Sequence, residues 1–158
     1  MIVKVNVENF ILFHKERVSL LNEFIEKEIH RRLIYQISFL GFESLARVFF
    51  PNESFSEKRF KNLLGKFLNG LMKKDIDELY HWRCSLIHEG FIALHYNTLE
   101  GWGESDRVFL SYPDDIMKES VEYSPEAIIS MYNRLILCIE EDFKENNTKD
   151  IEVTWKID

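Results

Sequence analysis

The chain has few of the residues that divide a protein into separate parts. Only three prolines and six glycines occur among its 158 residues, and neither type gathers in a linker. No apolar run approaches the roughly 18 residues that cross a bilayer, and the N-terminal residues lack the apolar region of a signal peptide. Internal repeats are also missing. We therefore expect one domain over residues 1–158, soluble in the cytoplasm and without membrane contact.

Cysteine and positive charge are also scarce. The two cysteines, Cys84 and Cys138, form no CxxC pair, so we expect reduced thiols rather than a disulfide. The net charge is −7 and the isoelectric point about 5.3. This balance disfavours a general nucleic-acid coat protein, whose affinity comes mainly from neutralising phosphates. An enzyme that contacts a few phosphates in one cleft stays compatible with it.

Hydrophobic residues are abundant, at 46% of the chain, and their spacing predicts helices. One helix is expected between Ser54, which has capping-box spacing to Glu57, and Gly70. A second runs from about 75 to 89. A third follows Ser124 as N-cap and ends near residue 146.

Residues 8–50 also have a helical pattern, but a single helix of that length would extend for about 60 Å at ~1.5 Å per residue. A compact domain would not hold it, so we expect a break near residues 26–30 and an end at Pro51. The apolar residues expected to be buried on the second piece are Leu33, Ile34, Ile37, Leu40 and Leu45.

Strands are predicted outside the helices. Residues 2–7 and 151–157 alternate as strands do, and residues 91–97 and 107–112 flank a turn-rich segment, which favours a hairpin. The predicted fold class is therefore mainly α: a bundle of four to five helices with a small appendage of a β-hairpin and strands.

An arginine interrupts the apolar stripe of the helix at about 75–89. In YHWRCSLIHEG, residues 80–90, the neighbours of Arg83 at helical spacing are all apolar or aromatic, namely Leu79, Tyr80, Leu86 and Ile87. A desolvated guanidinium needs an anion. That anion is either a carboxylate on another helix, for which Glu43 is a candidate, or a ligand.

His88 lies in the last turn of the same helix, where the helix dipole favours its protonated form. It could act as an acid or base near neutral pH, or simply cap the helix. Arg83 and His88 are ~140° apart around the axis and ~7.5 Å apart along it. A long arginine side chain and a frayed helix end would let both reach one phosphate.

The run from Arg83 to His88, RCSLIH, matches the Rx4–6H motif of HEPN domains, which are small helical bundles common in prokaryotic toxins and antiviral systems. The longer LYHWRCSLIHEG resembles the motif helix of a bacterial HEPN subgroup. LGFESLARVFFP, residues 40–51, resembles the helix that precedes it. The resemblance is clearest over residues 29–90 and implies a HEPN-like bundle.

The resemblance implies a homodimer whose two motif helices line one cleft, and a metal-independent endoribonuclease that needs no cofactor. His88 would be the general acid–base group at the ribose 2′-hydroxyl. Arg83 would hold the scissile phosphate, giving a 2′,3′-cyclic phosphate. RNA would be the substrate, and an antitoxin or regulatory protein a further partner. Cys84 stands where the family often has Asn, Asp or His. The alternative is therefore a non-catalytic module for RNA or nucleotide binding or for dimerisation.

Further residues could assist at such a site. The segment 57–74 carries a net charge of +5, which indicates either a solvated helix face or a strip that attracts phosphate. Tyr80, Cys84 and Ser85 flank Arg83. The candidate substrate-binding residues are therefore Lys58, Arg59, Lys61, Lys66, Lys73, Lys74, Tyr80, Cys84 and Ser85.

A metal site is a weaker alternative. His81, Cys84 and His88 fall at i, i+3 and i+7, so they share one helix face and could bind zinc with a fourth ligand. No complementary pair of ligands accompanies them. We therefore expect no metal, with His81 exposed and Cys84 as a small packing residue.

Overall fold

The chain folds into five helices and two small sheets in a computed structural model, which describes residues 2–29, 31–88, 107–110 and 120–154. This confirms the predicted fold class of a mainly α bundle with a small β appendage. The helices are α1 (Val7–Glu26), α2 (Arg31–Phe49), α3 (Ser56–Phe67), α4 (Lys73–His88) and α5 (Pro125–Glu145).

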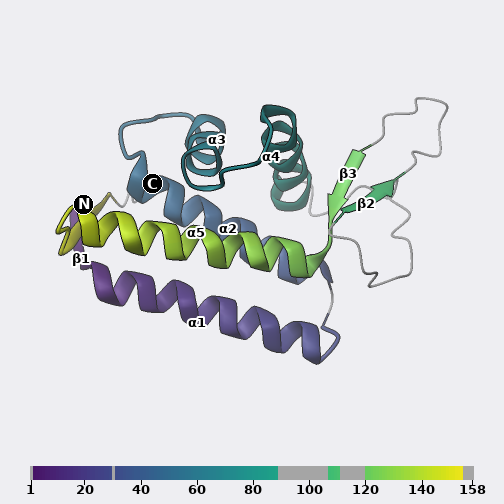
Figure 1. The fold of residues 1–158 in the computed structure, drawn as a ribbon, viewed down its shortest axis with the longest axis horizontal. Coiled ribbons are helices and arrows are strands. Elements are labelled where there is room, and N and C mark those ends of the chain that lie inside the picture. The colour runs from purple at the N-terminus through teal and green to yellow at the C-terminus, as the bar shows by residue number, and fades with distance from the viewer. Residues whose placement is uncertain (1, 30, 89–106, 111–119, 155–158) are drawn as a thin grey trace.

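The three long helices lie lengthwise and the two shorter ones pack on them from one side. Figure 1 shows α1, α5 and α2 running along the bundle, with α3 and α4 on the side away from α1. Helix α2 is the centre of this arrangement, because it contacts all four other helices. No helix within the described ranges is long and apolar enough to cross a membrane.

The helix boundaries agree with the predicted ones where capping side chains define them. The hydroxyl of Ser124 accepts a hydrogen bond from the Ala127 N–H at 3.1 Å, and α5 ends at Glu145. The predicted break is confirmed, because α1 ends at Glu26 and α2 begins at Arg31. Between them Glu28 adopts a φ of 52°, which turns the chain back toward α1.

Two of the predicted helix starts are wrong, by one residue for α3 and by two for α4. Helix α3 begins at Ser56 with Phe55 as N-cap, so Ser54 is not the cap. Glu57 then lies too early for a capping box and pairs with Lys61 at 2.6 Å instead. Helix α4 begins at Lys73, and the Asp75 carboxylate accepts a hydrogen bond from the Met72 N–H at 3.0 Å, back across the first turn.

The part of the core that α2 contributes includes several aromatic rings, and these determine which face of α2 is buried. Ile34 and Leu45 are buried as predicted, but Leu33 and Leu40 are 40% and 50% exposed, so that part of the prediction is wrong. The cause is that larger rings on the same helix take the core side. The fully or almost fully buried aromatic residues of α2 are Tyr35, Phe39 and Phe42.

The two sheets lie at opposite ends of the bundle, as Figure 1 shows. Strands β1 (Ile2–Asn6) and β4 (Asp150–Thr154) confirm two predicted strands and pair antiparallel with each other. Strand β2 (Arg107–Leu110) pairs with β3 (Ser120–Tyr123). Residues 91–97, the expected hairpin partner of β2, lie outside the described residues.

Helix α2 approaches α5 closely at a glycine. A Cβ atom built on Gly41 would lie 2.8 Å from Cε1 of Tyr132 and closer still to Cζ and Oη. Tyr132 is fully buried and cannot move aside easily. Gly65 on α3 provides the contrast, because a Cβ atom added there would have room. The nearest atom to its Cβ position is Cδ1 of Ile76 at 3.9 Å.

We expect Gly41→Ala and Gly65→Ala to change stability in opposite directions. Overpacking against Tyr132 should cost Gly41→Ala about 1–3 kcal/mol of unfolding free energy. Gly65→Ala should gain about 0.5–1 kcal/mol, because alanine is the better helix former. Urea unfolding measures both. Equal effects at the two positions would mean that α2 and α5 are not packed this closely.

Candidate functional site

Arg83 is buried at the interface between α4 and α2, with 4% of its surface exposed. Its Nη2 forms an ion pair with Oε1 of Glu43, which lies on α2. Of the two anions anticipated from the sequence, the carboxylate on another helix is the one observed, and Glu43 is the residue that was named. The charge in the apolar stripe of α4 is thus neutralised within the chain.

Arg83 also contacts an aromatic ring and a thiol of its own helix. Its guanidinium carbon lies 5.7 Å from the centre of the Tyr80 ring, within cation–π range, and its Nη1 lies 3.6 Å from Sγ of Cys84. Trp82 is buried beside it and packs on Tyr35 of α2, with the ring centres 4.6 Å apart. Trp82 was not among the candidate residues, although it stands three residues after the buried Leu79, a spacing that indicates the same helix face.

Helix α4 also carries the other motif residue. The helix is continuous from Lys73 to His88, so Arg83 and His88 belong to one element and His88 is its last residue. The side chains of Ser85 and His88 lie outside the described residues. The structure therefore describes the position of the Arg83 side chain but not that of the His88 side chain.

Two of the six cations of the basic segment are paired with carboxylates. Lys61 lies 2.6 Å from both Glu57 and Asp77, and Lys66 lies 3.3 Å from Asp142. Hydrogen bonds to Asp77 and then to Glu57 raise the pKa of Lys61, so this lysine stays charged and paired. These contacts favour the solvated-face interpretation of residues 57–74.

The remaining cations of the segment are local or exposed. Arg59 donates a hydrogen bond to the carbonyl oxygen of Glu53, and Nζ of Lys58 lies 5.4 Å from the centre of the Phe55 ring. Lys73 and Lys74 are exposed at the start of α4. Of the basic segment, Lys61 comes near Arg83, because its Nζ lies 5.4 Å from the centre of the Tyr80 ring that the Arg83 guanidinium also contacts.

No metal centre is evident in the described ranges, where His, Cys, Asp and Glu side chains nowhere gather in groups of three or more suited to a metal ion. His81 is exposed, as expected, and Cys84 is half-buried. Both Cys84 and Cys138 are free thiols, which agrees with the predicted absence of a disulfide.

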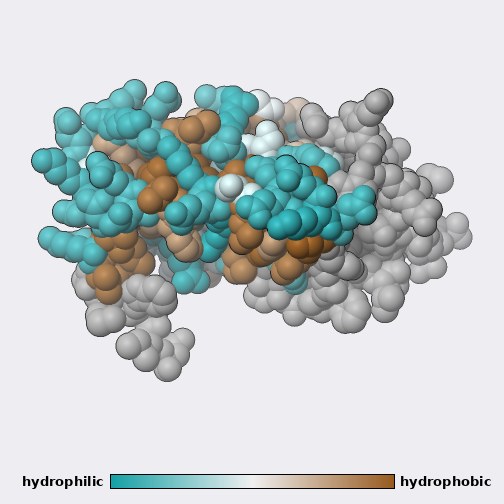
Figure 2. Space-filling view, turned by 90° about the horizontal axis from the view of Figure 1, so that it is seen from below, coloured by the Kyte–Doolittle hydropathy of each residue, from teal (hydrophilic) through white to brown (hydrophobic). Residues whose placement is uncertain are grey.

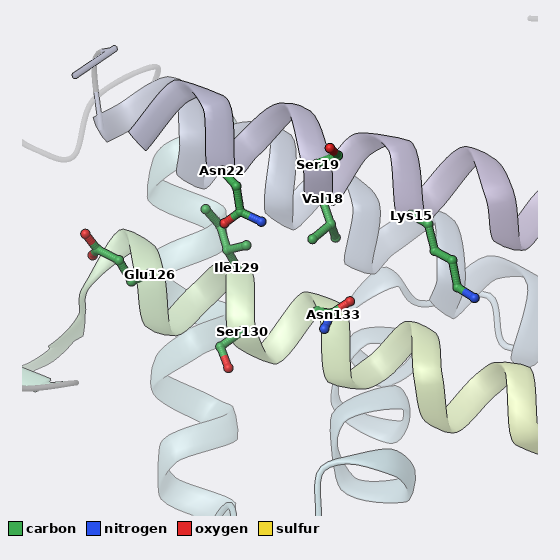
Figure 3. A pocket seen from close by; sticks show the side chains of 8 residues that line it. All are labelled: Lys15, Val18, Ser19, Asn22, Glu126, Ile129, Ser130 and Asn133. Atoms are coloured by element: carbon green, nitrogen blue, oxygen red, sulfur yellow. The ribbon is translucent and has the colours of Figure 1, made fainter. Parts of the chain in front are cut away.

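The described clefts lie away from Arg83. A shallow cleft of about 410 Å³ separates α1 from α5 and has a mainly polar lining, which includes Ser19, Asn22, Ser130 and Asn133 (Figure 3). A wider cleft of about 700 Å³ lies where the start of α1 meets the end of α5. Neither is lined by a residue of α2, α3 or α4.

Comparison with known proteins does not assign a family: no family model, curated protein or solved structure matches this chain. The resemblance to HEPN domains therefore rests on the motif residues of the sequence alone.

We expect the Arg83–Glu43 pair to be strongly coupled. Arg83→Met should cost roughly 3–5 kcal/mol of unfolding free energy, because it leaves the Glu43 carboxylate largely buried without its cation. The double variant Arg83→Met/Glu43→Leu should recover most of that loss, since both charges are removed. Urea unfolding of the single and double variants measures the coupling.

The exposed pair Lys27–Glu23, 3.4 Å apart, provides the control. Lys27→Met should cost no more than about 1 kcal/mol. If the effects of Arg83→Met and Glu43→Leu simply add, the two side chains do not depend on each other.

Proposed function

We propose that this chain is a non-catalytic HEPN-like helical module that acts by binding or assembly rather than by cutting RNA. The observation that carries the proposal is the ion pair between Arg83 and Glu43. In the cleavage mechanism that the resemblance implies, the guanidinium must stabilise charge on the scissile phosphate. A buried guanidinium that already has a carboxylate gains little from exchanging one anion for another.

The charge distribution supports the same proposal. An RNA-cleaving cleft needs cations that are available to the phosphates of the backbone. Lys61 and Lys66 are engaged by carboxylates, and the whole chain carries −7. Lys61, which shares the Tyr80 ring with Arg83, is thus paired with two carboxylates rather than open to a phosphate.

The exposed side chains of α4 indicate how well this helix would suit the expected homodimer interface. Its exposed side chains between residues 73 and 84 are Lys73, Lys74 and His81, and none of that stretch is a large exposed hydrophobic residue. The central part of a stable interface is usually apolar and depleted in charge. The described part of α4 therefore gives little support to a dimer along the motif helix, and the dimer and the antitoxin partner stay predictions.

A metal-independent endoribonuclease is the second candidate. The observation that favours it is the continuity of α4, which carries both Arg83 and His88 on one element. In this candidate His88 would take the proton from the ribose 2′-hydroxyl while Arg83 stabilises the phosphate, and the product would be a 2′,3′-cyclic phosphate. Arg83 would have to contact RNA while Glu43 holds it or after Glu43 releases it.

RNA cleavage by the purified full chain separates the two candidates. We expect end-labelled RNA to remain intact over hours with EDTA present, and His88→Ala to behave as the wild type does. The physical reason is that the Arg83 guanidinium is already paired with the Glu43 carboxylate. Gel electrophoresis of the RNA measures cleavage, and fluorescence anisotropy of the same RNA measures binding.

The contradictory result is cleavage that resists EDTA, yields 2′,3′-cyclic phosphate ends and disappears in both His88→Ala and Arg83→Lys. That result would establish the second candidate. His88→Ala is the sharper variant, because a substitution at Arg83 also disturbs a buried ion pair. Unchanged thermal unfolding of His88→Ala is the control that its fold is intact.

A further inference from the structure

A buried histidine joins α1 to α5 in the core. His14 of α1 and Tyr132 of α5 are both fully buried, and Nδ1 of His14 lies 2.5 Å from Oη of Tyr132. At the surface the same two helices are also joined by an ion pair between Lys15 and Glu140 at 2.6 Å. The contact between His14 and Tyr132 has no part in the Arg83 site, which lies between α2 and α4.

The surroundings of His14 suit a neutral imidazole. The ring centres of Phe10 and Phe13 lie 4.6 and 5.4 Å from that of His14, both edge-on. Nε2 of His14 is buried and has no hydrogen-bond partner in the described part of the chain. A proton added to this ring would bring a positive charge into an apolar environment without a new partner.

The groups that face His14 would not neutralise an imidazolium. On α1 the nearby charged group is Arg17, which has the same sign, and on α5 the facing titratable group is Tyr132. From α2, Gly41 packs against the Tyr132 ring and brings no charge. No carboxylate in the described ranges pairs with His14. Burial raises the pKa of Tyr132 to about 12, so the phenol stays neutral as well.

We propose that the His14–Tyr132 contact is an acid-sensitive latch, which holds α1 against α5 while His14 is neutral and opens when His14 binds a proton. Opening would expose the side of α1 that is now buried. The buried residues on that side are Val7, Phe10, Ile11, His14, Val18 and Leu21.

The direction of the pH effect follows from linkage. Burial, and then the charge of Arg17, lowers the pKa of His14 to about 3 in the closed form, against an ordinary value of 6.5. The open form therefore takes up the proton more readily than the closed form. The contribution of the latch is complete above about pH 6.5 and is lost as the pH falls from there toward 3.

Urea unfolding at pH 7.5 and pH 5.5 tests the latch in the full chain. The urea concentration at the unfolding midpoint of the wild type should be lower at pH 5.5 than at pH 7.5. For His14→Phe this decrease should be distinctly smaller, whatever the stability of the variant at pH 7.5. The double variant His14→Phe/Tyr132→Phe should show the same reduced loss while leaving no buried hydroxyl unpaired.

The exposed His81→Gln is the control and should keep the wild-type loss. An equal loss in wild type and His14→Phe would overturn the proposal.

Two measurements on the wild type locate the effect without a substitution. Nitrogen NMR of the imidazole should find His14 neutral in the folded chain down to about pH 5, and a titration midpoint near 6.5 would overturn the proposal. Hydrogen exchange, corrected for intrinsic rates, should show α1 losing protection at pH 5.5 before α4 does. Simultaneous loss in both helices would mean that acid opens the whole bundle and not this contact.

Discussion

The ion pair between Arg83 and Glu43 is the constraint on which the arrangement of α4 depends. Arg83 is buried and Glu43 is half-buried where α4 packs on α2, so each charge there is stabilised by the other. The pair therefore fixes where α4 meets α2 along the helix. It is also the observation on which the proposed non-catalytic role rests, because this guanidinium already has a carboxylate as its partner.

Helix α2 carries the determinants of two different interfaces within three residues. Gly41 allows the Tyr132 ring of α5 to approach the backbone, and Glu43 receives Arg83 of α4. Tyr132 in turn reaches His14 of α1. One short stretch of α2 thus contacts the helices on both of its sides.

Local sequence patterns were sufficient to predict most helices and strands. They were not sufficient to predict contacts between residues that are distant in the chain. The caps of α5, the break at residues 26–30 and the strands at both ends follow from short-range chemistry, so the sequence indicated them. The exposure of Leu33 and Leu40 and the pairing of β1 with β4 depend on residues distant in the chain. For the site, the sequence showed that Arg83 needs an anion and suggested Glu43, but only the packing of α4 on α2 could decide between a carboxylate and a ligand.

The most direct test of the account is to observe the Arg83 guanidinium itself while RNA is added. NMR of the arginine side-chain N–H groups, with a cleavage-resistant 2′-deoxy oligonucleotide as the probe, reports whether Arg83 changes partner. The account predicts that the Arg83 signals stay unchanged at saturating oligonucleotide and shift only when Glu43 is replaced. A saturable shift of the Arg83 signals in the wild type would contradict it, because the phosphate would then compete successfully with Glu43.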